Sequence, residues 1–184
     1  MQPIEILKLR KLVEKFQFEQ LCGDDNSLER IITVADTNRP GLELAGFFEN
    51  SHLKRIIILG DKEISYIQTM SEEKQIQSFD FLTSEDTPAI IITKRHICPP
   101  LLKKVADEKN FPVLSSSSAT YRLIVDIVTY LDEQLSPTTT IHGGLLSIFG
   151  KGVLIFVEIW ESFQQIKEKR FFRLTKSLLS GIMK

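Results

Sequence analysis

The chain has 184 residues, of which 42% are hydrophobic and 26% charged, and its formal net charge is −1. This composition is typical of a globular protein, and a net charge near zero gives no global field that would attract nucleic acid or an anionic membrane. No apolar run approaches the ~18 residues of a membrane-spanning helix, and the charges within residues 1–16 exclude a secretory signal. We therefore expect a cytoplasmic protein with neither nucleic acid nor a membrane as its partner.

The two cysteines, Cys22 and Cys98, lie far apart in the sequence. Their spacing matches neither a metal site nor a disulfide framework. We expect each to be a small buried hydrophobic residue in a reducing compartment, and we predict no metal site.

Helical and strand patterns alternate along the first 135 residues. The β-α-β pattern over 87–116 favours two parallel strands with a crossover helix, and the whole alternation favours a three-layer α/β domain. In chain order we predict a helix over 4–16, strands over 18–21 and 31–34, a short helix from about Leu42, a strand over 55–60, and helices over 61–70 and 71–81. A strand over 87–94 follows, then a helix that starts at Pro99 and Pro100 and continues over 101–109, a strand over 111–116 and a helix over 121–135.

Side chains at two predicted helix starts suggest caps. Asp61 follows a strand and a glycine, and it is placed to cap the helix over 61–70. Ser115–Ser118 is a run of four serines before the helix over 121–135. We interpret this run as a loop and N-cap, and the alternative is a phosphate site.

A break in composition follows this helix. The sequence "SPTTT" at 136–140 is typical of a boundary. Beyond it we predict strands over 139–142 and 145–149 and a Gly-Lys-Gly turn into a strand over 153–155. The predicted domains are an α/β domain over 1–134, the first strands of a second domain over 135–155, and a basic and aromatic tail over 156–184.

One candidate binding site follows the predicted strand over 31–34. Asp36, Asn38 and Arg39 lie where an α/β sheet presents its ligand-binding loops. These polar groups and the arginine are suited to holding an anion. The alternative is that these residues only form a turn, which Pro40 and Gly41 favour.

His142 is the candidate catalytic residue, since a histidine at a strand end before two glycines can act near neutral pH. The alternative is a structural histidine. His52 and His96 are expected on the surface. Lys151, between two glycines, is interpreted as a solvated turn residue, with a phosphate ligand as the alternative.

The segment after Ile155 departs from the pattern that precedes it. A strand ending "GVLI" often leads into a phosphate-binding loop, which needs glycines, a lysine and a hydroxyl. Residues 156–163 offer no glycine and no lysine, and they carry Glu158 and Glu161. The tail that follows is either an amphipathic helix that binds a partner or a membrane, or a sequence that was never selected to pack within a fold.

Five motifs occur in order along the chain: "ITVADTNRPGLELAGFF", "RIIILGDKEISYI", "TPAIIITK", "FPVLSSSSATYRL" and "LDEQLSPTTTIHGGLLSIFGKGVLI". Taken together, they resemble the bacterial HPr kinase/phosphorylase family. The resemblance implies an N-terminal α/β domain similar to one in the Mur ligases, followed by a P-loop catalytic domain. It also implies hexamers that use ATP or pyrophosphate with Mg²⁺ to phosphorylate a serine of the phosphocarrier HPr, that remove this phosphate again, and that thereby act in carbon catabolite regulation.

The resemblance extends over about 9–155 and then stops. His142 matches the family's I-H-G histidine, and residues 152–155 match the strand before the Walker loop. The loop, its lysine, its Mg²⁺ hydroxyl and the catalytic aspartate do not follow, and Gly144 stands where the family usually has an apolar residue. We therefore expect a catalytically incomplete chain that needs no cofactor of its own, although the intact family uses ATP or pyrophosphate and Mg²⁺.

Two explanations of the departure remain open. Residues 156–184 are an out-of-frame translation, or the chain is a short paralogue that keeps a regulatory, ligand-binding or oligomerisation module. In either case the expected partners are HPr, further copies of the chain, or intact kinase subunits.

Overall fold

Two isoleucine-rich strands, β3 (Ile56–Leu59) and β4 (Ile90–Ile92), form the middle of a five-stranded sheet in the computed structural model. The structure describes residues 6–49, 54–136, 143–148 and 151–156. The chain divides into two compact units, residues 1–137 and 138–184, which we describe separately.

The sheet of the first unit has the order β1-β5-β4-β3-β2. Strands β2 to β5 pair in parallel, and β1 pairs with β5 in the antiparallel direction. The predicted parallel β-α-β unit is therefore confirmed. The three remaining strands are β1 (Glu19–Cys22), β2 (Thr37–Asn38) and β5 (Val113–Ser115).

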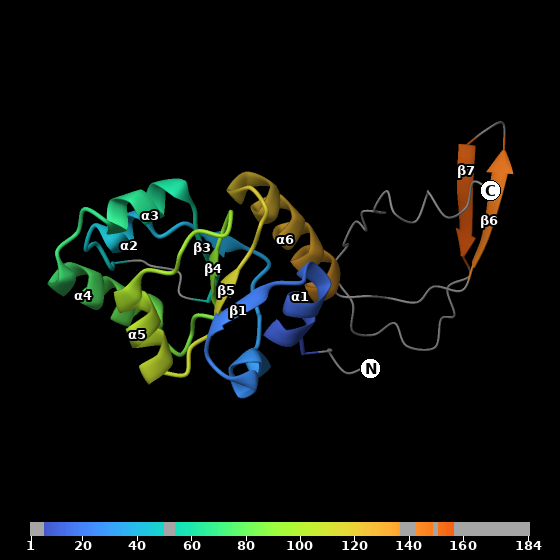
Figure 1. The fold of residues 1–184 in the computed structure, drawn as a ribbon. Coiled ribbons are helices and arrows are strands. Elements are labelled where there is room, and N and C mark those ends of the chain that lie inside the picture. The colour runs from blue at the N-terminus through green and yellow to red at the C-terminus, as the bar shows by residue number, and fades with distance from the viewer. Residues whose placement is uncertain (1–5, 50–53, 137–142, 149–150, 157–184) are drawn as a thin grey trace. The chain divides into compact units, whose positions relative to one another are not determined.

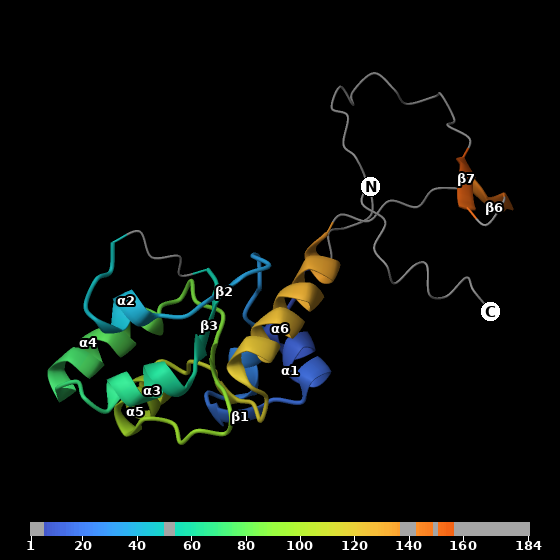
Figure 2. The same ribbon diagram turned by 90° about the horizontal axis from the view of Figure 1, so that it is seen from above.

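Helices cover both faces of this sheet, as Figures 1 and 2 show. Alternate side chains of β3 enter opposite cores: Ile57 and Leu59 pack in one cluster, whereas Ile56 and Ile58 pack in the other. The predicted three-layer α/β domain is thus confirmed. The first core contains residues of α2 (Gly41–Leu44), α3 (Asp61–Ile67), α4 (Glu72–Leu82) and α5 (Pro100–Glu108), and the second contains residues of α1 (Leu9–Phe16), the 3₁₀ helix η1 (Asp25–Glu29) and α6 (Thr120–Leu135).

The predicted strand over 31–34 is wrong. Ile31 forms only an isolated bridge with Lys8, and the sheet strand lies further on, at β2. The Ile32 amide donates to the Leu7 carbonyl at 2.8 Å, and the Ile32 side chain is 1% exposed. Ile32 is thus buried against the segment before α1 rather than within the sheet, whereas its neighbours Ile31 and Thr33 are exposed.

Both predicted caps are also wrong. Gly60 is the N-cap of α3, and Asp61 is the first helical residue, with its carboxylate bound to Lys94 and His96 instead. Ala119 is the N-cap of α6 and makes no side-chain cap bond. The serines before it bond among themselves, since the Ser118 amide donates to Ser116 Oγ at 3.2 Å.

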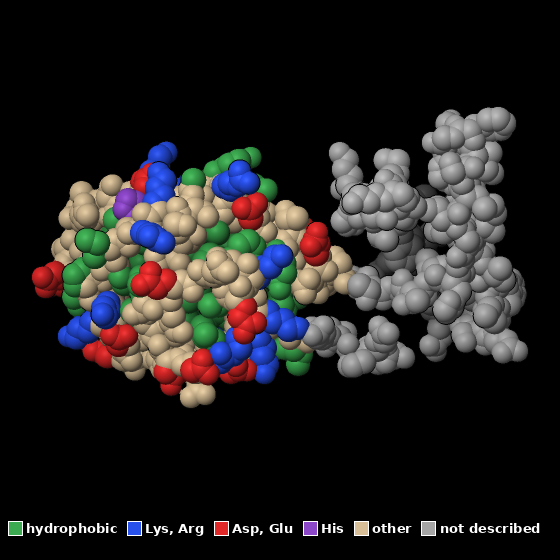
Figure 3. Space-filling model, turned by 45° about the vertical axis from the view of Figure 1, so that its right-hand side comes forward, with side chains coloured by type: hydrophobic (Ala, Val, Ile, Leu, Met, Phe, Trp, Pro, Cys, Tyr) green, Lys and Arg blue, Asp and Glu red, His purple; other side chains and the backbone are tan. Residues whose placement is uncertain are grey.

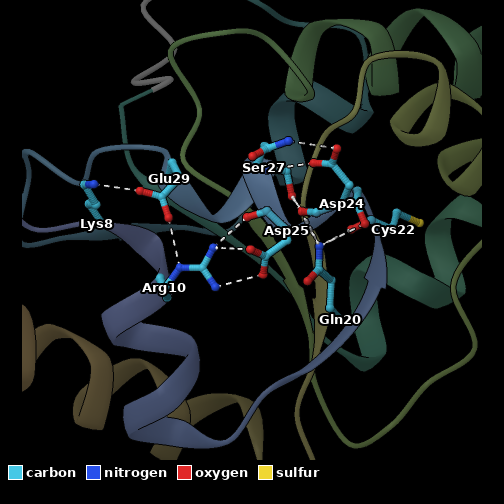
Figure 4. A network of polar contacts seen from close by, with 10 residues as sticks. Lys8, Arg10, Gln20, Cys22, Asp24, Asp25, Ser27 and Glu29 are labelled. Carbon is cyan, nitrogen blue, oxygen red and sulfur yellow. Dashed lines mark hydrogen bonds and ion pairs between the residues drawn. The ribbon is translucent and has the colours of Figure 1, made fainter.

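A network of charged side chains joins α1 to η1 (Figure 4). Arg10 donates through two nitrogens to the two carboxylate oxygens of Asp25, each at 2.8 Å, and through Nε to Glu29 at 2.9 Å. Lys8 Nζ donates to the other oxygen of Glu29 at 2.6 Å. The ion pairs of Arg10 with Asp25 and Glu29 hold α1 in one orientation relative to η1. Exposed ion pairs of this kind nevertheless contribute little to stability.

In the second unit, β6 (Gly143–Ile148) and β7 (Lys151–Phe156) pair as an antiparallel hairpin. Lys151 is therefore the first residue of a strand, and the prediction of a turn at Lys151 and Gly152 is wrong. His142, the predicted strand over 139–142 and the tail beyond Phe156 lie outside the described residues.

Arg30 joins two distant parts of the first unit. Its Nη1 donates to the carbonyl oxygens of Glu85 at 3.0 Å and Thr87 at 2.8 Å, and its guanidinium lies 4.9 Å from the centre of the Phe111 ring. Burial lowers the pKa of Arg30. The loop before β4 is thus held by a half-buried cation.

We expect Arg30→Met to lower the free energy of unfolding by about 1–3 kcal/mol, because it leaves the partly buried carbonyl group of Thr87 and that of Glu85 without this donor. Urea unfolding followed by circular dichroism measures this change. The matched control is Arg122→Met at a side chain that is 82% exposed, where the change should stay within about 0.5 kcal/mol. Equal effects of the two substitutions would contradict the role assigned to Arg30.

Candidate functional site at the carboxyl edge of the sheet

The four parallel strands end at one edge of the sheet, where α/β folds bind their ligands. The loops at this edge begin after Asn38, Leu59, Ile92 and Ser115. They carry the polar side chains of Arg39, Asp61, Lys94 and His96, so this edge is the candidate functional site.

Close packing holds the middle of the edge together. Thr93 and Thr120 join their hydroxyl groups at 2.8 Å, linking the end of β4 to the start of α6. A Cβ atom added to Gly60 would lie 2.7 Å from Thr120 Oγ1. Glycine is therefore required where β3 turns into α3, and the ends of β3, β4 and α6 form one rigid base.

Of the three predicted ligand-binding residues, Asn38 and Arg39 lie where β2 ends, whereas Asp36 precedes β2 and lies at the amino end of the strands. Each of the three contacts a different partner. Asp36 pairs with Arg55 Nε at 3.0 Å. Asn38 Nδ2 donates to Glu43 Oε1 at 3.0 Å. Arg39 binds Glu63, so the three side chains do not form one cluster.

The pairing of Arg39 with Glu63 orients the arginine. Arg39 Nη2 lies 2.8 and 2.9 Å from the two carboxylate oxygens of Glu63. Glu63 also accepts the Gly60 amide at 2.9 Å, so its carboxylate is held from two sides. The Glu63 side chain is 8% exposed, whereas that of Arg39 is 43% exposed. Within the described part of the chain, Arg39 Nε and Nη1 make no hydrogen bond, and these donors remain available to a ligand.

A shallow cavity of about 300 Å³ lies beside this pair, between α2 and α3. Glu63 lines the cavity, whereas its partner Arg39 is not one of the lining residues. The other lining residues combine a cation, an aromatic ring and small apolar surfaces: Lys62, Tyr66, Gly41, Leu44 and Ala45.

A second cluster joins the ends of β3 and β4. Asp61 pairs with Lys94, and Asp61 Oδ1 lies 2.6 Å from His96 Nε2. Lys94, and to a smaller degree His96, lowers the pKa of Asp61. Sequence reasoning placed His96 on the surface without finding this partner. The order of the strands was the available signal, because adjacent parallel strands bring the loops that follow them together.

The loop that carries Lys94 has an uncommon backbone. Lys94 and Arg95 both have left-handed conformations, with φ of 54° and 53°, which non-glycine residues rarely adopt. Their amides donate to the carbonyl groups of Ser118 and Ser116 at 3.2 and 2.9 Å, which holds the loop in place. Strained backbone of this kind clusters at functional sites.

This loop presents its next side chains to solvent. Ile97 is 88% exposed, and Tyr121 on the neighbouring element is 81% exposed. Figure 3 shows the histidine beside Lys and Arg side chains at the upper left of the first unit. The edge therefore combines cations with exposed apolar groups, although the whole chain has a net charge of −1.

Two kinds of feature are missing from the residues that the structure describes. No group of three or more His, Cys, Asp or Glu side chains there could hold a metal ion. None of the helices in that part of the chain is long and apolar enough to cross a membrane. His142, the candidate catalytic residue, lies outside those residues and stays a prediction.

Comparisons with known proteins agree on one relationship. A family model described as "HPr Serine kinase N terminus" matches residues 7–131. The HPr kinase/phosphorylase of Bacillus licheniformis is 38% identical over 149 residues, which are 81% of this chain and 48% of the relative. Those of Bacillus cereus strain B4264 and Bacillus anthracis strain A0248 are 37% and 36% identical over the same shares. The chain thus spans about half the length of the curated relatives it matches.

The Asp61 cluster has a measurable pH dependence. Because the folded pKa of Asp61 lies below the ordinary value of about 3.9, its pairing stabilises the fold above that pH. This stabilisation is lost as the pH falls through the lowered pKa. We expect Lys94→Met to raise the pKa of Asp61 in an NMR titration of its carboxyl carbon. Arg95→Met, which changes a neighbouring cation that does not bind Asp61, should leave it unchanged.

Proposed function

The chain belongs to the HPr kinase/phosphorylase family, and we propose that it serves that phosphorylation system as a non-catalytic module. In this proposal the first unit binds a small anion beside Arg39 and regulates or joins other components, whereas the chain itself does not transfer phosphate. The observation that carries the proposal is the pairing of Arg39 with Glu63, because Glu63 lines the cavity and the pairing leaves two donor atoms of Arg39 available.

The ligand that this site suits best is a small carboxylate or phosphate. A guanidinium presents its donors in a planar fork that matches these anions. Lys62 lines the cavity and adds a second positive charge, while Tyr66 and Leu44 provide apolar surface for the body of the ligand. The carboxylate of Glu63 compensates part of the Arg39 charge, so the site favours a ligand of low charge.

Phosphoryl transfer to HPr depends on a phosphate loop, a lysine and Mg²⁺, which position the nucleotide and neutralise its charge. The residues after Ile155 contain no loop of the form G-x-x-x-x-G-K-[ST]. This is the ground for proposing a catalytically incomplete chain.

A second candidate function is association with intact kinase subunits or with further copies of the chain. It is favoured by Ile97 and Tyr121, the two most exposed large apolar side chains among the described residues, beside the cations of the same edge. Arginine and aromatic residues are enriched at the centres of protein interfaces. Co-purification with an intact relative, lost in an Ile97→Ser/Tyr121→Ser double variant, would favour this function over ligand binding.

We expect the purified chain to leave HPr unphosphorylated with either ATP or pyrophosphate as donor and with Mg²⁺ present. Transfer of labelled phosphate to HPr, followed by mass spectrometry of the acceptor serine, measures this activity. An intact relative in a parallel reaction is the positive control. Phosphoserine on HPr at a level above a reaction without the chain would refute the proposal.

We expect inorganic phosphate or a small carboxylate such as citrate to raise the melting temperature of the chain. Arg39→Ala should abolish the shift, because it removes the available donors. Since that substitution leaves Glu63 unpaired, an Arg39→Ala/Glu63→Gln variant provides a folded comparison. Arg122→Ala, at an exposed arginine outside the site, should retain the shift. The anion site is refuted if no probe shifts the wild-type chain or if the shift persists without Arg39.

A further inference from the structure

Helix α6 carries two apolar stripes, and the first unit covers only one of them. Leu123, Ile127 and Leu131 are buried in the core on that face of the sheet. A second stripe follows the outer side of the helix, where Tyr121 is 81% exposed and Val125 is 46% exposed. Apolar side chains that line up on an exposed helix face are typical of an interaction surface.

Helical spacing brings the members of this outer stripe together. Tyr121, Val125 and Val128 stand at i, i+4 and i+7, which form one face of an α-helix. Val128 is partly buried, and the exposed Asp132 extends the same face by one more turn. Helix α1 lies against another side of α6 (Figure 2). The outer stripe is therefore an apolar face that ends in a carboxylate.

The two ends of α6 carry opposite charges. Arg122 lies in the first turn with a side chain that is 82% exposed, and its Nε is 3.8 Å from Asp126 Oδ2. Asp132 and Glu133 lie near the last turn and are exposed. Glu133 follows Arg122 after about three turns of the helix, so both lie on the same flank of the outer stripe. A second α6 that runs in the opposite direction would thus place unlike charges opposite each other.

We propose that the outer stripe of α6 binds a second copy of this chain, with the two helices antiparallel about a two-fold axis. The axis passes between Val125 and Val128, so that Val125 of one copy contacts Val128 of the other. Each Arg122 then faces Glu133 of the other copy. A two-fold interface uses the same surface on both copies, and this surface is complementary to itself.

Two further features favour this arrangement. Each Tyr121 reaches the level of Asp132 in the other copy, where its hydroxyl donates to the carboxylate. Parallel packing would instead place Arg122 against Arg122 and Glu133 against Glu133, and such like-charge contacts oppose association. One pair of helices that are roughly 24 Å long forms a small interface. We therefore expect a weak dimer whose population depends on concentration.

This proposal deepens the second candidate function, association with further copies of the chain, and does not depend on anion binding at Arg39. Val125 and Glu133 lie away from the loop of Ile97, so variants there separate the α6 interface from association through that loop. A monomeric chain whose melting temperature still rises with phosphate would overturn the dimer and leave the anion site standing.

The test is sedimentation velocity of the full chain over a wide concentration series. We expect the mass to rise from that of the 21.1 kDa chain to twice that value. Val125→Glu should keep the chain monomeric where the native chain is dimeric, because it buries a carboxylate from each copy at the centre of the interface. The matched control is Ile76→Glu on α4, where the native side chain is also 46% exposed, and it should leave association unchanged. Circular dichroism checks that both variants fold.

Charge reversal tests the antiparallel direction. Arg122→Glu or Glu133→Arg alone should raise the dissociation constant about fivefold, because each places like charges opposite across the two-fold axis. The Arg122→Glu/Glu133→Arg double variant should return it to within about twofold of the native value, since both pairs are restored with their signs exchanged.

Three results would overturn the proposal. The first is a native chain that stays monomeric at every concentration. The second is a dimer that Val125→Glu and Ile76→Glu affect equally. The third is a charge-reversed double variant that dimerises as weakly as the two single variants.

Discussion

The fold depends on one constraint, which is that its two central strands are apolar on both faces. All side chains of β3 and β4 are buried, with exposures of 0–2%. A parallel strand of this kind needs helices on each side, and burial of each such side chain contributes roughly 1.5–3 kcal/mol. The two helical layers, the crossover between β4 and β5, and the placement of α6 on the face opposite α5 all satisfy this one requirement.

The same constraint moves the polar chemistry to the ends of the strands. A sheet covered on both faces has room for charged groups only at its edges and in its loops. The paired groups at the carboxyl edge are accordingly formed between loops, as in Arg39 with Glu63 and Asp61 with His96. The left-handed backbone at Lys94 and Arg95 is tolerated because the neighbouring serine carbonyls hold it in place. Rigid strands and strained loops therefore coexist at the candidate site.

Sequence reasoning succeeded where burial alone determines structure and was incomplete where distant residues meet. The central strands, their flanking helices and the parallel pairing followed from long apolar runs and their spacing. The strand predicted over 31–34 was wrong because a buried β-branched residue, Ile32, is equally compatible with a loop packed beneath a helix. The partners of Arg39 and Asp61, namely Glu63 and His96, were missed because they lie 24 and 35 positions further along the chain. Of the candidate site, the position at strand ends was predictable, whereas the pairing that leaves two Arg39 donors available required the structure.

The contact of Thr120 with Thr93 has a mechanical consequence for the domain. Thr120 begins α6, a helix of 16 residues that runs roughly 24 Å at 1.5 Å per residue. Its buried stripe of Leu123, Ile127 and Leu131 keeps it from sliding freely over the sheet. Because this stripe holds α6 along its length and Thr93 holds its start, the helix is a straight spacer that fixes the distance between the end of β4 and Leu135.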